Sequence, residues 1–78
     1  MSDVTELERA WLEDVGMRVR LARVRRRETQ DELATVAAVS RVTLGSVERA
    51  DHPAVVLTYV RLARTLGLSL GELLAGAP

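Results

Sequence analysis

All eleven basic residues of this 78-residue chain are arginines, and six of them lie within residues 15–27. That segment has no acidic residue and a net charge of +6, whereas residues 1–14 carry a net charge of −4. Two interpretations of this cluster are open from the sequence. Its guanidinium groups contact phosphates, or they form a solvated helix face that is balanced by the acidic segment.

Side chains suited to catalysis or metal binding are sparse. His52 is the single histidine and the chain has no cysteine, so neither a metal site nor a redox site is expected. The carboxylates lack the pairing that acid–base chemistry needs, and no Ser/His/Asp set converges. We therefore expect no enzymatic activity and no cofactor.

Hydrophobic spacing predicts five helices and no strand. The first is expected over residues 5–26, capped by Thr5 or Ser2, because apolar residues recur there every three or four positions. Gly16 interrupts this pattern and predicts a bend or a break near the middle of the helix. The expected inner stripe consists of Leu7, Trp11, Val15, Val19 and Ala22, with Trp11 in the core rather than in a subunit or partner contact.

Capping signals place the second and third helices. Thr29 and Glu32 form a capping box, so a helix begins at Gln30. Ser40 caps the next helix and leaves residues 38–39 for a tight corner, which requires the two helices to cross steeply. The expected inward residues are Leu33, Ala34 and Ala37 from the first of the two and Leu44 and Val47 from the second, which leaves Arg41, Val42, Gly45, Ser46 and Arg49 facing outward.

Breakers and caps also place the last two helices. Pro53 ends the third helix in a loop, since proline cannot continue a helix. Apolar residues from Val56 onward predict a fourth helix that stops at Gly67, and Ser69 with Glu72 caps a short fifth one.

The stretch TQDELATVAAVSRVTLGSVERA, with VRLAR upstream and LARTLGLSLGELL downstream, resembles the phage-repressor-like (Xre/Cro) helix-turn-helix family over about residues 15–75. In that family a 20-residue unit begins with Gln and has a small residue fifth and apolar residues tenth, fifteenth and eighteenth. Those places are held here by Gln30, Ala34, Val39, Leu44 and Val47.

The resemblance implies an all-α, five-helix, lambda-repressor-like DNA-binding domain with its helix-turn-helix at the second and third helices. The first helix is then extended at its N-terminus. The expected organisation is an acidic helical extension at residues 1–14, the DNA-binding domain at 15–75 and a frayed end at 76–78.

The resemblance also implies roles for single residues. The helix after Ser40 is expected to enter the major groove, where a guanidinium pairs with guanine and a methyl group meets thymine. The implied base contacts are Arg41, Val42 and Ser46, the implied phosphate contacts are Gln30, Thr43 and Arg49, and the implied structural salt bridge joins Arg23 to Glu48.

Three positions depart from the family pattern. Arg27, Ala38 and Ala50 stand where the family usually has glycine. If the backbone is left-handed there, each non-glycine residue costs on the order of 1 kcal/mol.

The expected function is sequence-specific DNA binding by a transcriptional regulator, a repressor or a controller-type autoregulator. A chain this short is expected to pair as a homodimer on a near-palindromic operator, through a surface that includes Leu57, Leu70 and Leu74, with the first helix adding to it. The alternative is a protein-interaction module that captures a protein partner, antitoxin-like or on a polymerase or another regulator, through the acidic, Trp-bearing residues 1–14. No apolar run is long enough for a membrane span and no signal peptide is evident, so a cytoplasmic protein is expected.

Overall fold

The computed structural model describes residues 3–78, which form five α-helices and no strand. The predicted all-α domain of five helices is therefore confirmed for this part of the chain. The helices are α1 (Glu6–Arg25), α2 (Gln30–Ala37), α3 (Arg41–Arg49), α4 (Val56–Leu66) and α5 (Leu70–Leu73).

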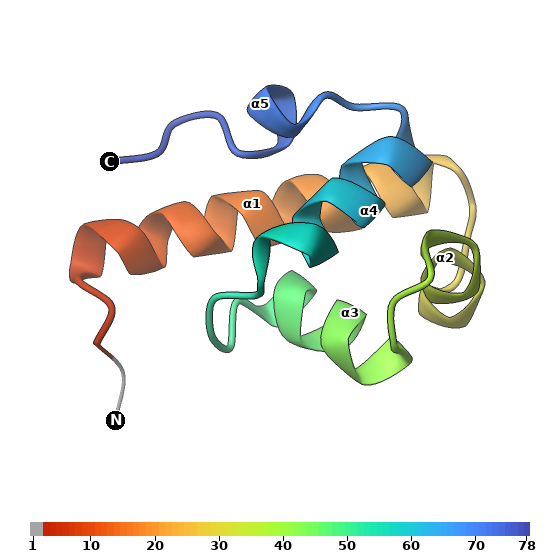
Figure 1. Ribbon diagram of the computed structural model, residues 1–78, viewed down its shortest axis with the longest axis horizontal. Helices are drawn as coiled ribbons and strands as arrows, with labels where there is room; N and C mark the ends of the chain where they lie inside the picture. Colours follow the sequence, from red (N-terminus) through yellow and green to blue (C-terminus); the bar gives the residue numbers. More distant parts are fainter. Residues whose placement is uncertain (1–2) are drawn as a thin grey trace.

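The longest helix, α1, is the element on which three others pack (Figure 1). Its 20 residues rise about 30 Å, close to the longest dimension of the domain, 32 Å. In Figure 1, α3 lies below α1, α5 lies above it and α4 crosses in front, and each of these helices contacts α1. The view looks nearly down the axis of α2, whereas α3 runs across it, so these two helices cross steeply.

Side-chain caps set the start of four helices, as the sequence predicts. Thr5, Thr29 and Ser69 each form a capping box with the glutamate three residues later, and Ser40 accepts a hydrogen bond from the N–H of Thr43. The alternative first cap, Ser2, lies outside the described residues.

The capping glutamates are shifted toward the ionised form. Backbone and side-chain hydrogen bonds from Thr29 lower the pKa of Glu32, and those from Ser69 lower the pKa of Glu72. A lowered folded-state pKa stabilises the fold above the ordinary value of about 4.3, and this stabilisation is lost as the pH falls through the folded value.

The core is built from aliphatic side chains of all five helices around one tyrosine. α1 contributes a stripe that differs from the predicted one at its N-terminal end. Leu7 is 73% exposed, because no other helix flanks that side of the first turn, and Leu12 is buried instead. The main buried cluster is Val15, Val19, Leu33, Ala34, Ala37, Leu44, Val47, Tyr59, Leu62, Ala63, Leu66 and Leu73.

Trp11 packs against this cluster and is half-buried. Its indole N–H donates to the carbonyl oxygen of Leu74 at 3.1 Å. This contact joins the N-terminal half of α1 to the segment after α5, which supports the assignment of Trp11 to the core.

α1 continues without a break through Gly16, so the predicted break is wrong. A Cβ atom at this position would collide with the carbonyl oxygen of Val47 and lie 3.0 Å from that of Glu48. Glycine is required here because the backbone of α3 approaches α1 too closely for a side chain.

The backbone is left-handed at all three positions where the family usually has glycine. Arg27, Ala38 and Ala50 have φ angles of 57°, 60° and 55°. Each follows a helix, so the turns keep the geometry that glycine favours. The chain therefore accepts a conformational cost on the order of 1 kcal/mol at each of them.

Candidate nucleic-acid interface

The inner side of α3 is fixed by the core. Leu44 and Val47 are almost fully buried, as predicted. Glu48, on the same helix, forms a two-point salt bridge with Arg23 of α1, in which Nε donates to Oε2 at 2.7 Å and Nη2 donates to Oε1 at 2.9 Å. The predicted structural pair is confirmed, and the hydrogen bonds that Arg23 donates to Glu48 raise the pKa of Arg23.

Gln30 extends this network to the start of α2. Its Nε2 donates to Oε1 of Glu48 at 3.0 Å, and its side chain is half-buried. The residue that the resemblance places on a phosphate thus already has a partner within the chain. Gln30, Arg23 and Glu48 together tie α1, α2 and α3 to one another.

The outer side of α3 presents Arg41 and Val42 at its N-terminal end. Both side chains are exposed, and Val42 is 76% exposed. Arg49 is exposed at the other end of the helix. Between the two arginines lies Gly45, where an added Cβ would stand 3.0 Å from Nη1 of Arg49 and 3.4 Å from Nη1 of Arg41. Gly45 is therefore covered by the two guanidinium groups rather than open to solvent as expected.

Ser46 does not face outward as predicted. It is only 7% exposed, and its Oγ hydrogen-bonds with Nε2 of His52 at 3.2 Å. The reason is that the loop after α3 folds back over this side of the helix, an arrangement that local sequence does not reveal. Thr43 is half-buried and its Oγ1 accepts a hydrogen bond from Oγ of Ser40 at 2.8 Å.

A shallow groove of about 400 Å³ separates α3 from the loop and from the start of α4. The sequence does not reveal its far wall, because Pro53 predicts that the third helix ends but not where the following loop lies. The groove is lined by Val42, Thr43, Ser46, Val47, His52, Pro53, Ala54, Val55 and Thr58.

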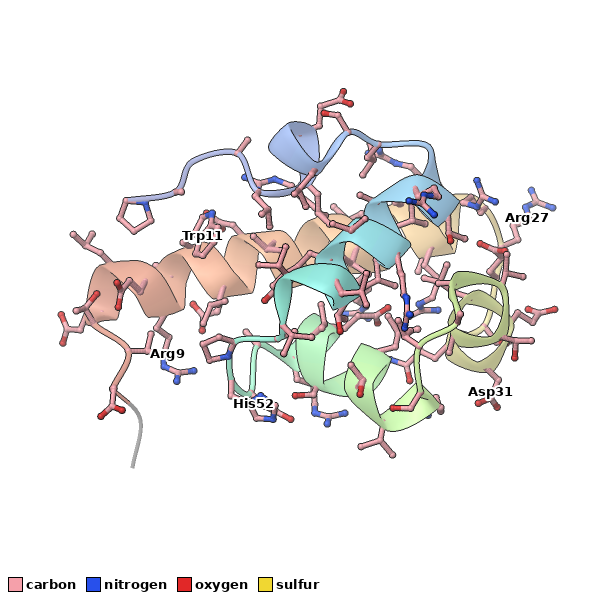
Figure 2. The ribbon with its side chains drawn as sticks, in the orientation of Figure 1. Arg9, Trp11, Arg27, Asp31 and His52 are labelled. Atoms are coloured by element: carbon pink, nitrogen blue, oxygen red, sulfur yellow. The ribbon has the colours of Figure 1, made fainter. Side chains whose placement is uncertain are left out.

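Acidic residues lie beside the arginines of α3. Arg41 Nε is 3.6 Å from Oδ1 of Asp31 on α2, and Arg49 Nη2 is 2.9 Å from Oδ2 of Asp51. Figure 2 shows Asp31 and His52 on the side of the molecule that carries α3. Both ion pairs are exposed, and pairs of this kind contribute about 0–1 kcal/mol. Their arginines can therefore exchange a carboxylate for a phosphate or a base at low cost.

Three arginines of residues 18–27 have different partners within the chain. Arg18 donates to the carbonyl oxygen of Leu73 at 3.0 Å, Arg23 binds Glu48, and Arg26 pairs with Glu28. Within residues 3–78, no ion pair joins this cluster to the acidic residues that precede it. The acidic segment therefore does not balance the cluster by direct pairing in one chain.

The three leucines predicted for a dimer interface differ in exposure. Leu57 is 52% exposed, whereas Leu70 and Leu74 are half-buried and pack against the core. Leu70 and Leu74 thus use most of their apolar surface inside the chain, since α5 lies against α1 and α4.

Other classes of site were sought among the described residues. No group of three or more His, Cys, Asp or Glu side chains there is arranged to hold a metal ion. Within the same residues, no helix combines the length and the apolar character needed to cross a membrane.

Comparisons of the chain with models of protein families, with curated proteins and with solved structures found no match.

Proposed function

We propose that this protein is a sequence-specific DNA-binding transcriptional regulator of the helix-turn-helix type, in which α3 enters the major groove. The observation that carries the proposal is the two-sided character of α3. One side is held by the core and by the Arg23–Glu48 pair, and the other exposes Arg41 and Val42. A helix held in this way presents its first residues to base edges in a fixed orientation.

The chemistry of the two exposed residues fits base recognition. A guanidinium donates two hydrogen bonds to O6 and N7 of guanine, and a valine methyl packs on the methyl group of thymine. Val42 is 76% exposed, so its methyl groups are accessible to a base. We assign base reading to these two residues and phosphate contact to Arg49, and we give Ser46 the role of holding His52.

The packing of α2 against α3 supports the same geometry. Ala34 is 3% exposed, and its carbonyl oxygen accepts a hydrogen bond from the N–H of Val39 at 3.1 Å. A larger side chain at this buried position would push the two helices apart. On α4, Arg61 donates to the carbonyl oxygen of Ala38 at 3.1 Å and so ties α4 to the corner between α2 and α3.

The alternative, a protein-interaction module that acts through residues 1–14, has less support. Trp11, the aromatic residue that such a module would use, donates a hydrogen bond to the carbonyl oxygen of Leu74 and packs against the core. Deleting residues 1–13 would also remove the buried Leu12, so the loss of a partner after this deletion would not separate binding from unfolding.

The test begins with the selection of bound sequences from a pool of random DNA duplexes. Affinities of wild type, Arg41→Ala and Arg49→Ala are then measured on the selected site and on single-base variants of it. Arg41→Ala should lose discrimination at one base pair, by about 1–3 kcal/mol. Arg49→Ala should weaken all duplexes alike and reduce the salt slope by about one unit.

Val36→Ala is the matched control, because Val36 is an exposed valine on α2, 68% exposed and outside the groove beside α3. It should bind every duplex as wild type does. If no sequence is enriched, or if Arg41→Ala keeps full discrimination, α3 is not the reading helix and the proposal fails.

A further inference from the structure

A second apolar stripe runs along α1 on the side that faces solvent. We call it the outer stripe; its members are spaced alternately by three and four residues, the pattern of a coiled-coil seam. The four large apolar members are 45–73% exposed, although the opposite stripe of the same helix fills the core. The outer stripe consists of five apolar residues and, in its middle, one acidic residue: Leu7, Ala10, Asp14, Met17, Leu21 and Val24.

A row of charges follows one edge of the outer stripe at intervals of seven residues. It reads Glu6, Glu13, Arg20 and then Arg27 just beyond the end of α1. These four side chains are exposed, and none of them forms an ion pair within the described residues. The order along the helix is therefore two acids followed by two bases.

In an antiparallel pair of such helices, the acidic half of each helix lies beside the basic half of the other. When a second α1 lies antiparallel, Glu13 of each copy faces Arg20 of the other, and Glu6 lies toward the basic end of the other helix. The outer layers of the seam are then apolar, because Leu7 meets Val24 and Ala10 meets Leu21, and the two central layers pair Met17 with Asp14. A parallel arrangement would instead bring the two acidic halves together at one end and the two basic halves together at the other, which is unfavourable.

We propose that the outer stripe of α1 is a homodimer interface in which two copies of this chain pair antiparallel. This gives a use to Glu13 and Arg20, whose exposed side chains form no ion pair within the described residues. It also relocates the dimer contact from Leu57, Leu70 and Leu74 to a face that packs against no other helix.

The symmetry of such a dimer is compatible with the proposed DNA binding. This point, unlike the interface itself, rests on the proposed function. A two-fold axis that exchanges antiparallel helices is perpendicular to both helices and to the line between them. Figure 1 shows α3 and α5 on opposite sides of α1 and α4 on a third side. The outer stripe is exposed, so we infer that it lies on the remaining side. Both copies of α3 then lie on the same side of the dimer, as binding to one face of a duplex requires.

The first test uses sedimentation equilibrium on the full chain without DNA. Leu21→Glu places two charges in the seam of each dimer and should weaken self-association by about 100-fold or more. Val36→Glu is the matched control, since it adds the same charge at an exposed site on α2 and should leave self-association unchanged. A wild type that stays monomeric to about 1 mM, or a Leu21→Glu variant that dimerises normally, overturns the proposal.

The second test exchanges charges and identifies the orientation. Glu13→Arg alone and Arg20→Glu alone should each weaken the homodimer by about tenfold, because every altered contact occurs twice. An equimolar mixture of the two variants should form a heterodimer in which both contacts are again attractive, and the double variant E13R/R20E should recover the homodimer. Absence of either recovery overturns the antiparallel arrangement.

These results can be separated from those of the DNA-binding test. If α3 does not read DNA, the charge-exchange pattern in DNA-free protein is unaffected. If the outer stripe is not the interface, Arg41→Ala still changes base discrimination while the charge variants self-associate as wild type does.

Discussion

The two sides of α3 contain the same kind of ion pair in very different surroundings. On the inner side, Arg23 holds Glu48 through two hydrogen bonds, and the two side chains are 14% and 4% exposed. On the outer side, Arg49 holds Asp51 with side chains that are 60% and 44% exposed. Desolvation makes loss of one inner partner costly, whereas water readily replaces an outer partner. The Arg23–Glu48 pair therefore fixes the position of α3, whereas Arg49 can exchange Asp51 for another partner.

The largest expected effect is at Gly16, where α1 meets the backbone of α3. Helix propensity alone predicts that Gly16→Ala stabilises the protein by about 1 kcal/mol. The contact with the carbonyl oxygens of Val47 and Glu48 predicts the opposite sign, a net loss of about 2–3 kcal/mol, because the added methyl forces the helices apart. Chemical denaturation measures the difference.

Gly71→Ala is the control for this substitution. Its added Cβ would approach only Oγ of Ser69, at 3.9 Å, so the same change should be neutral or stabilising there. Equal effects at the two glycines would show that α1 and α3 are not in close contact.

Breaking the inner ion pair should have an effect of similar size. Glu48→Ala leaves Arg23 without its carboxylate and Gln30 without its acceptor, and should cost about 2–3 kcal/mol of unfolding free energy. Asp51→Ala removes the outer pair in the same way and should cost less than about 1 kcal/mol. Thermal or denaturant unfolding measures both losses. If Glu48→Ala and Asp51→Ala lower the unfolding free energy by similar amounts, the inner and outer ion pairs do not differ in their contribution to stability.

The corner that leads into α3 offers a gain in stability. Ala38 has a φ of 60° and an exposed side chain, so Ala38→Gly relieves the left-handed conformation without opening a cavity. The relief exceeds the added entropy of the unfolded chain, and we expect a stabilisation of about 0.5–1 kcal/mol. A lower melting temperature for this variant would contradict the expectation.

The smallest expected effect is at Asp31, and it tests whether Arg41 is free to leave this carboxylate and bind DNA. Asp31→Asn removes the carboxylate beside Arg41 and one negative charge from the face that carries α3. Binding to the selected duplex should become about two- to fivefold tighter, with no change in folding stability. Fluorescence anisotropy at two salt concentrations measures it, and weaker binding would indicate that Asp31 positions Arg41 for recognition.

Features that depend on near neighbours in the chain were predictable from the sequence. The capping boxes at Thr29 and Ser69, the cap at Ser40 and the stop at Gly67 join residues a few positions apart, and all appear where expected. Local hydrogen bonding and the helical repeat are sufficient to place five helices, because neither depends on distant parts of the chain.

Features that depend on which distant surfaces meet were decided only by the tertiary structure. Leu7 and Leu12 both fit a helical apolar repeat, but packing buries only Leu12. Ser46 lies on the polar side of α3, yet the loop with His52 covers it, and Gly16 is explained by a carbonyl group that is 31 residues away in the chain. Periodicity describes each helix in isolation, whereas burial depends on the helices packed around it, and the sequence alone does not specify their contact.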